Sequence, residues 1–189
     1  MIKKILKPYE ALYPVPVVLV TSVGKDGKPN ILTIAWTGTV SSTPPCVSIS
    51  IRPSRRSFDL INQTKEFAIN IPSEKYLTEV DYCGTVSGKN IDKFEQTKFT
   101  AVGANKIKPP LIKECSVNIE CKVEKFIDFE SHRMFIGRIV AVNADENILT
   151  AFEQIDYSKT SPIVYNRGQY WSLNKRIGEF GMSRKLGRL

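Results

Sequence analysis

The chain has 189 residues, 42% of them hydrophobic and 24% charged, with a formal net charge of +8 at pH 7. This length can bury one substantial core but is short for two, so we expect a single domain over residues 1–189. No segment approaches the roughly 20 consecutive apolar residues of a membrane-spanning helix, and no secretory signal is recognisable. We therefore expect a cytoplasmic protein without a membrane partner.

Cysteine and histidine limit the metal chemistry open to the chain. The four cysteines, Cys46, Cys83, Cys115 and Cys121, have scattered spacings without a CxxC pair, and His132 is the single histidine. A structural zinc site needs closely spaced pairs of such ligands. The sequence therefore predicts no metal site. It also predicts that the four thiols are reduced, as in a cytosolic protein.

Basic residues gather in a C-terminal tail from about residue 172. From Asn166 onward the chain has a net charge of +5, because Glu179 is the single acidic residue among Arg167, Lys175, Arg176, Arg184, Lys185 and Arg188. Two interpretations stay open: a tail that meets nucleic acid or another polyanion, and a solvated terminus.

Strand patterns dominate the first part of the chain. Residues 17–23 are β-branched, and a Lys-Asp-Gly-Lys turn leads to a second run over 30–40, so these two runs should pair as an antiparallel hairpin. After Pro44-Pro45, residues 46–51 alternate apolar and small polar side chains, which is typical of a strand with one face on the core.

The pattern then alternates between short helices and strands. Residues 54–63 have helical spacing with serines placed to cap the first turn, and 66–71 return to a strand. A second helix follows Pro72, capped by Ser73 and running toward Cys83, before a loop over 84–90. The remaining strands are expected at residues 116–129, 132–144 and 163–165, the first two as an antiparallel pair.

Many strands with few short helices predict a mainly β protein, an antiparallel barrel with short peripheral helices. No GxGxxG follows a strand, and no GxxxxGK[ST] loop is present. The sequence therefore excludes nucleotide sites of the Rossmann and P-loop types.

Residues 33–42 combine hydroxyl groups with small side chains. Exposed amides, hydroxyls and small residues such as Ala35 and Gly38 suit the edge of a flat heteroaromatic ligand. The alternative is an ordinary strand in which threonines fit the sheet and Trp36 fills the core.

Arginines and serines over residues 52–57 lie where a strand passes into a helix. Unpaired amides at a helix start, with an adjacent arginine, would hold a phosphate well, although an exposed basic turn is the alternative. The Pro44-Pro45 pair would then set the spacing between ring and phosphate. His132 has no recognisable partners for a catalytic triad.

Several segments, in this order and spacing, resemble the flavin reductase-like family of the FMN-binding split-barrel superfamily, in particular its flavoredoxin-type members. The resemblance runs from about Pro14 to Tyr170 and rests on PVPVVLVTS, DGKPNILTIAWTGTVSSTPPCVSISI, RPSRRSFDLI, EFAINIP, CGTVSGKNIDKF, SHRMFIGRIVAV and PIVYNRGQYW. It implies a homodimer of split barrels with FMN near the interface.

The resemblance also implies the cofactor-binding residues. Around the ring and ribityl chain they are Asn30, Thr33, Ile34, Ala35, Trp36, Thr37, Gly38, Thr39, Ser41 and Ser42; around the phosphate Ser50, Arg52, Ser54, Arg55 and Ser57; and from a second loop Ser87, Gly88, Lys89 and Lys93. His132 matches a histidine near the nicotinamide of NADH or NADPH, and Glu130-Ser131 replaces the family's usual small-acidic pair before it. No side chain is assigned as an essential acid or base.

The function so implied is that of an FMN-dependent oxidoreductase or flavoredoxin-type electron-transfer protein. It would pass electrons from NAD(P)H or another donor through FMN to a small-molecule or protein acceptor. One alternative is a flavin carrier without turnover of its own. Another is a small basic β-barrel that binds nucleic acid through Trp36, Tyr170, Trp171 and the tail.

Overall fold

The computed structural model describes residues 2–173 and 175–185. Its strands within those residues are β1 (Val15–Pro16), β2 (Val18–Val23), β3 (Pro29–Ile34), β4 (Thr37–Ser42), β5 (Pro45–Ile51), β6 (Glu66–Ile71), β7 (Ala101–Val102), β8 (Leu111–Ile112), β9 (Val117–Asp128), β10 (Arg133–Ala144), β11 (Ile163–Asn166) and β12 (Gln169–Ser172). Its α-helices are α1 (Arg56–Thr64), α2 (Leu77–Thr85) and α3 (Lys93–Thr97), with 3₁₀ turns at Glu74–Tyr76, Glu146–Ile148, Tyr157–Lys159 and Met182–Lys185.

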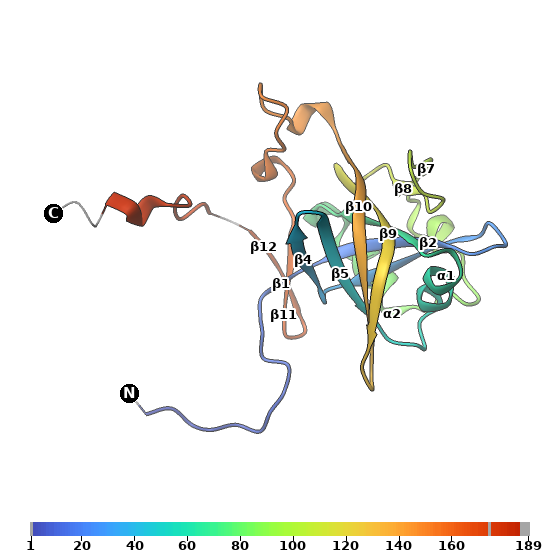
Figure 1. Ribbon diagram of the computed structural model, residues 1–189, viewed down its shortest axis with the longest axis horizontal. Coiled ribbons are helices and arrows are strands. Elements are labelled where there is room, and N and C mark those ends of the chain that lie inside the picture. Colours follow the sequence, from blue (N-terminus) through green and yellow to red (C-terminus); the bar gives the residue numbers. More distant parts are fainter. Residues whose placement is uncertain (1, 174, 186–189) are drawn as a thin grey trace.

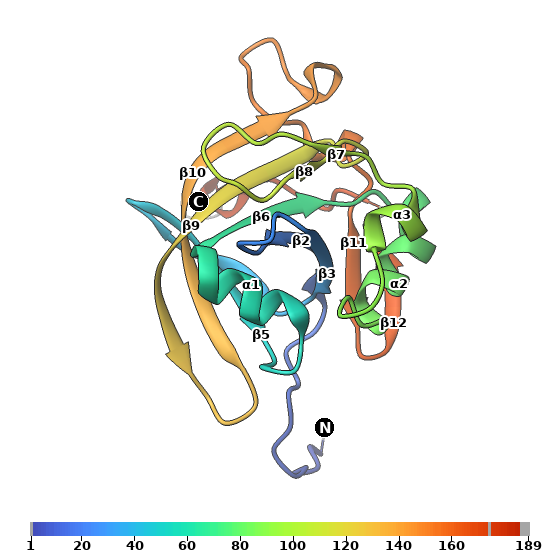
Figure 2. The same cartoon turned by 90° about the vertical axis from the view of Figure 1, so that its right-hand side faces the viewer.

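Seven strands form one antiparallel sheet in the order β3-β2-β6-β9-β10-β5-β4. The outermost strands of this order, β3 and β4, are separated in sequence by only Ala35 and Trp36. The sheet must therefore curl until its two ends meet, and Figure 2 shows it closing into a barrel beside α1. The seam of the barrel lies at Ala35 and Trp36.

Alternating side chains divide the core between the inside and the outside of the barrel. Val18 and Val20 point into the interior cluster with residues such as Phe67. Val17 and Leu19 point outward into a second cluster, which α2, α3 and β11 cover. Because β2 is buried on both faces, its sequence is an unbroken apolar and hydroxyl run.

A three-stranded sheet, ordered β1-β11-β12, stands beside the barrel. In Figure 1 both chain ends leave the molecule on this side, the N-terminal segment downward from β1 and the C-terminal segment outward from β12. Within the described part of the chain, no helix is long and apolar enough to cross a membrane.

The predicted mainly β barrel is confirmed, but the run over 30–40 is not one strand. Only its first part, β3, pairs with β2, whereas β4 pairs with β5. The chain changes partners at the seam, which a continuous pattern of strand-forming residues cannot reveal. The predicted strands over 46–51, 66–71, 116–129 and 132–144 correspond to β5, β6, β9 and β10.

The predicted helix caps were wrong. Arg55 precedes α1 and Ser73 precedes the 3₁₀ turn, and neither side chain makes a cap hydrogen bond. Pro44 lies in the β4–β5 turn and lines a cavity with Val40 and Glu124. The segments predicted to hold the ring and the phosphate are joined directly, since the Ser50 amide donates to the Trp36 carbonyl at 2.9 Å.

Candidate functional site at the barrel seam

A cavity of about 390 Å³ opens at the seam, where β3, β5 and α2 meet the β11–β12 hairpin. Its lining combines apolar, cationic and hydroxyl groups from segments far apart in sequence. These residues are Val17, Leu32, Thr33, Ile34, Ala35, Trp36, Ser50, Ile51, Arg52, Arg55, Asp81, Gly84, Thr85, His132, Tyr165, Gly168 and Tyr170.

Close packing of α2 against β3 fixes one wall of the cavity. The Thr33 hydroxyl donates to the Val80 carbonyl at 2.5 Å, so a strand side chain ties down the helix backbone. Gly84 allows this approach, because a Cβ there would lie 3.2 Å from the Thr33 Cβ. The wall is therefore set by backbone packing rather than by mobile side chains.

Trp36 and His132 form an aromatic pair at the rim. Their ring centroids are 4.6 Å apart at an interplanar angle of 41°, and the Ser131 hydroxyl lies 2.8 Å from the His132 Nδ1. Burial, and then the positive charge of Arg52, lower the pKa of His132 below its usual value. His132 is therefore neutral at pH 7 and presents a ring that can stack and hydrogen-bond without adding charge.

Two arginines make part of the cavity strongly positive. Arg52 and Arg55 lie on the turn between β5 and α1, where the Arg55 amide donates to the Arg52 carbonyl at 3.0 Å. Among the residues that the structure describes, neither guanidinium forms an ion pair or a side-chain hydrogen bond. Two uncompensated guanidinium groups lining one cavity are typical of an anion site.

Tyr170 and Asp81 line another part of the cavity. The Tyr170 hydroxyl donates to the Asp81 carboxylate at 3.0 Å, and its ring packs edge-on against Tyr165. Burial and the hydrogen bond to Asp81 raise the pKa of Tyr170, so the phenol stays protonated. This bond fastens the β11–β12 hairpin to α2 across the cavity.

A second basic cavity, also of about 390 Å³, lies behind the start of α1 and is lined by Lys28, Arg56, Gly88, Lys89 and neighbours. Arg56 donates to the Lys89 carbonyl at 3.3 Å and lies 3.7 Å from the Asp26 carboxylate. Arg56 thus links the β2–β3 turn to the loop after α2, and the predicted phosphate segment is divided between two cavities.

The structure gathers part of the predicted site at the seam and places the rest elsewhere. The predicted residues that line the seam cavity are Thr33, Ile34, Ala35, Trp36, Ser50, Arg52, Arg55 and His132. Those outside its lining are Asn30, Thr37, Gly38, Thr39, Ser41, Ser42, Ser54, Ser57, Ser87, Gly88, Lys89 and Lys93. Gly88 and Lys89 line the second basic cavity, and Ser41 lines the cavity near Pro44.

Three of these outlying residues are structural supports. The buried Asn30 amide donates to the Ser57 hydroxyl at 2.8 Å, and Gly88 packs so tightly on Asn30 that a Cβ would lie 1.9 Å from its Oδ1. Ser57 is fully buried at the start of α1. These contacts hold α1 and the 86–92 loop against β3, behind the arginine turn.

Sequence reasoning did not assign to the predicted cofactor site the residues that close the cavity opposite β3. Asp81 and Thr85 come from α2, and Tyr165 and Tyr170 from the β11–β12 hairpin. These residues belong to no local motif that predicts chemistry. The signal present in the sequence was the YNRGQY segment, which has the turn residues of a tight hairpin.

The fold is a closed antiparallel barrel whose seam cavity lies between a strand edge and an arginine turn. The model of the flavin reductase like domain matches residues 10–174 of this chain. The chain therefore belongs to the flavin reductase-like domain family.

Individual relatives agree with this assignment. Flavoredoxin of Desulfovibrio vulgaris (Miyazaki F) is 31% identical and superposes with a TM-score of 0.90, covering 97% of this chain and 100% of that one. A flavin reductase-type protein with a split barrel domain from Shewanella frigidimarina, 21% identical, has the same fold with a TM-score of 0.80 over 88% of this chain and 85% of that one. An uncharacterized Archaeoglobus fulgidus protein is 33% identical over 157 residues, 83% of this chain and 88% of that protein.

Proposed function

We propose that the seam cavity binds FMN and that the protein transfers electrons through it, as a flavin reductase or a flavoredoxin-type carrier. The observation that carries this proposal is the pair of uncompensated guanidinium groups, Arg52 and Arg55, in a cavity that also has an apolar lining and an aromatic rim. A flavin mononucleotide combines a flat, largely apolar ring system with a dianionic phosphate. The cavity therefore offers the two kinds of contact that FMN requires.

The surrounding residues fit the polar edge of a flavin as well. Ala35 and Trp36 lie between the β3 and β4 ladders, and apart from the Trp36 carbonyl, which accepts from Ser50, they offer backbone groups to a ring edge. Apolar side chains of Leu32 and Ile51 line the same space and exclude water from a bound ring. Bound flavin supplies hydride and single-electron chemistry, and the protein supplies position and electrostatics.

Each group of residues has a distinct part in this proposal. Arg52 and Arg55 hold the phosphate, and their positive charge favours an anionic ligand. His132, neutral and in tilted contact with Trp36, marks the side from which a nicotinamide donor would approach. The protonated Tyr170 keeps the hairpin wall in place through Asp81.

We further propose that the whole chain acts as one cytoplasmic flavin-binding unit, paired as a homodimer, with NADH or NADPH as electron donor and a small molecule or protein as acceptor. These points rest on the family and its flavoredoxin relatives. The nucleic-acid alternative gains no support. Two of its three stacking candidates are engaged elsewhere, Trp36 with His132 and Tyr170 with Asp81, and Trp171 donates its indole N–H to the Gln169 side chain.

The test is the affinity of the purified protein for FMN, followed by flavin absorbance and fluorescence quenching. We expect Arg52→Ala with Arg55→Ala to weaken FMN binding by tenfold or more, because each charge-assisted phosphate contact is worth about 1.5–3 kcal/mol. Lys108→Ala with Lys113→Ala removes the same charge from exposed positions outside the cavity and should leave the affinity unchanged.

A colourless protein that takes up no added FMN would refute the proposal. If both double variants lose the same FMN affinity, Arg52 and Arg55 act only through the overall charge of the protein and not through contact with the phosphate. Anaerobic mixing with NADH or NADPH then separates the two forms of the proposal. A reductase loses the yellow colour with one of these donors, whereas a carrier stays oxidised until a partner protein is added.

A further inference from the structure

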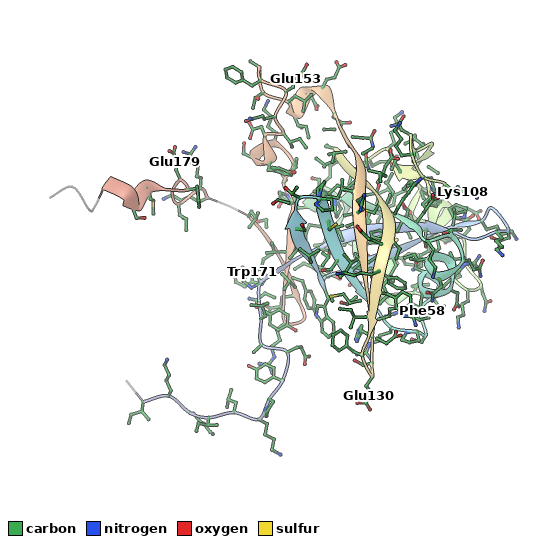
Figure 3. The ribbon with its side chains drawn as sticks, in the orientation of Figure 1. Phe58, Lys108, Glu130, Glu153, Trp171 and Glu179 are labelled. Atoms are coloured by element: carbon green, nitrogen blue, oxygen red, sulfur yellow. The ribbon has the colours of Figure 1, made fainter. Side chains whose placement is uncertain are left out.

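The second basic cavity shares no lining residue with the seam cavity. Its volume is about 390 Å³, and its cationic side chains are Lys28, Arg56 and Lys89. They come from three segments, namely the β2–β3 turn, the start of α1 and the loop after α2. In Figure 3, Phe58 of α1 lies across the barrel from Trp171 of the β11–β12 hairpin, which borders the seam cavity. The second basic cavity is therefore a separate site on the α1 side of the barrel.

Most of the positive charge in this cavity is not neutralised within the protein. Among the described residues, the ammonium groups of Lys28 and Lys89 form no ion pair and no hydrogen bond. The carboxylate among the lining residues belongs to Asp92, which accepts from the Glu95 amide at 3.1 Å and so caps α3. Three cations that line one cavity with a single carboxylate attract an anion.

Arg56 has hydrogen-bonding capacity that the protein leaves unused. Its Nε is buried and, in the described part of the chain, has no hydrogen-bond partner. Its other contacts are long, since one terminal nitrogen donates to the Lys89 carbonyl at 3.3 Å and the other lies 3.7 Å from the Asp26 carboxylate. A buried N–H without a partner costs free energy, and an anionic oxygen in the cavity would satisfy it. The side chain keeps 23% of its surface exposed, so a ligand can reach it.

The loop that carries Lys89 is held in place by contacts within the protein. Gly88 packs against Asn30 so closely that a Cβ would lie 1.9 Å from the Asn30 Oδ1, and the Arg56 guanidinium holds the Lys89 carbonyl. The Lys89 amide also donates to the Ser87 hydroxyl at 3.4 Å. A preformed site loses less conformational entropy on binding than one that must first become ordered.

The size and lining of the cavity favour an organic phosphate over a phosphate ion alone. The cavity is larger than a phosphate ion, and Pro29 and Ile91 give it apolar surface beside the three cations. Ile91 is 39% exposed, so its side chain can contact a ligand. A phosphomonoester carries about two negative charges at pH 7 and presents three strong acceptor oxygens. These oxygens match three separate cationic groups, and an attached organic group would fill the remaining space.

Among the molecules that the proposed function would use, NADPH has such a phosphate. The phosphate of FMN is assigned to Arg52 and Arg55 in the seam cavity. NADPH differs from NADH by one phosphomonoester on its adenosine, and this group needs a cationic site of its own. Arg56 follows Arg55 directly in the chain, so the two cavities adjoin at the start of α1.

We propose that the second basic cavity binds an organic phosphomonoester through Lys28, Arg56 and Lys89, and that its ligand is the adenosine 2′-phosphate of NADPH. The three cations hold the phosphate, and Pro29 and Ile91 contact the adenosine. The cavity thereby favours NADPH over NADH as electron donor. The choice of NADPH rests on the proposed function, whereas the phosphate site rests on the cavity alone.

Isothermal titration calorimetry of the full-length protein in excess FMN tests the site. The probes are adenosine 2′-monophosphate, adenosine and inorganic phosphate. We expect adenosine 2′-monophosphate to bind at least roughly tenfold more tightly than adenosine, which lacks the charge-assisted contacts. It should also bind more tightly than inorganic phosphate, which lacks the apolar contacts.

Lys28→Ala with Lys89→Ala removes two ammonium groups that form no hydrogen bond or ion pair in the described chain, so the variant should fold. We expect it to raise the dissociation constant of adenosine 2′-monophosphate at least roughly tenfold. Lys4→Ala with Lys7→Ala removes the same charge from exposed positions on the N-terminal segment, which leads away from the barrel in Figure 1, and should have no effect. Arg52→Ala with Arg55→Ala should lose FMN affinity but bind this probe as the wild type does.

Titration with NADP⁺ and NAD⁺ under the same conditions tests the choice of donor without requiring turnover. We expect NADP⁺ to bind the wild type at least roughly tenfold more tightly than NAD⁺, because of the additional phosphate contacts. The two should bind Lys28→Ala with Lys89→Ala with similar affinities. Equal affinities for the wild type would overturn the assignment of NADPH.

Three results would overturn the phosphate site: no binding of adenosine 2′-monophosphate, equal losses in the two lysine double variants, or a loss in Arg52→Ala with Arg55→Ala in place of the Lys28 and Lys89 variant. Inorganic phosphate that binds as tightly as adenosine 2′-monophosphate would overturn the role of Pro29 and Ile91. A protein that binds adenosine 2′-monophosphate through Lys28 and Lys89 but takes up no FMN would instead refute the proposed function and support the phosphate site.

Discussion

Lys93 lies among apolar side chains with only 2% of its surface exposed. Its ammonium donates to the Ile31 carbonyl at 2.9 Å and to the Cys83 carbonyl at 2.7 Å. The family resemblance implied that Lys93 contacts the cofactor from a second loop. In the structure this side chain instead joins β3 to the end of α2, so that it positions the cavity wall without reaching the cavity.

The burial of Lys93 makes the stability of the protein depend on pH. Burial lowers the pKa of this lysine from 10.5 to about 8, against the opposing effect of Cys83 and with a small contribution from Arg55. Between these two values the unfolded chain holds a proton that the folded chain has released. Unfolding then takes up a proton, and the contribution of Lys93 to the free energy of unfolding rises as the pH rises.

Lys93→Met keeps the length of the side chain but leaves the Ile31 and Cys83 carbonyls unpaired, so we expect the free energy of unfolding to fall by about 1–3 kcal/mol. The wild type gains stability relative to the variant as the pH rises from about 8 to 10.5, because only the wild type has the lysine proton to release. Urea titrations across that window measure the difference. A difference that stays constant with pH would contradict this account.

At the scale of elements, the segment 30–40 shows where local pattern stops being informative. Its residues suit a strand throughout, and both β3 and β4 are strands. What the pattern lacks is the change of partner at Ala35 and Trp36, because that change depends on β5 lying beside β4 after the sheet has curled. The short strands β1 and β12 were missed for a related reason, since they exist through pairing with β11.

The position of the 86–92 loop behind the arginine turn depends on the absence of a side chain at Gly88. In Gly88→Ala the new methyl group would lie 1.9 Å from the Asn30 Oδ1, so Asn30 or the loop must move and its bond to Ser57 is strained. We expect a loss of roughly 1–3 kcal/mol in the free energy of unfolding, as for overpacked cores. The matched change Gly103→Ala meets nothing within 4 Å and should be near neutral. Equal effects of the two changes, measured by urea denaturation, would contradict the packing argument.

At the scale of the whole molecule, the seam cavity draws on most of the fold. In sequence, its lining residues run from Val17 to Tyr170, which spans most of the described chain, and β3, β5, α2 and His132 just before β10 contribute between them. A ligand that touches all of these elements should stabilise them together, because binding to the folded state alone shifts the unfolding equilibrium.

We therefore expect FMN at about 100 times its dissociation constant to stabilise the wild type by about 2.7 kcal/mol and to raise the melting temperature by roughly 5–10 °C. Riboflavin, which lacks the phosphate, should raise it less at the same concentration. In Arg52→Ala with Arg55→Ala the two flavins should have similar, small effects. Thermal denaturation measures the melting temperature for all four combinations of protein and flavin. Equal increases with FMN and riboflavin in the wild type would show that the arginines do not contact the phosphate.

The family resemblance implied that the segments 33–42 and 52–57 belong to one cofactor site. Local patterning by itself determined that this chain is a mainly β barrel and where most of its long strands lie. Those features depend on alternating side chains and on residue types that act over a few positions. Only the tertiary structure decided which arginines line the cavity and that Asp81 and Tyr170 close its wall. It also decided that the side chains of Lys93 and Ser57 are buried and support neighbouring elements. The physical reason is that these roles arise only when the sheet curls and segments distant in sequence meet. Side chains of the same type then face solvent, core or cavity, depending on contacts that no local pattern contains.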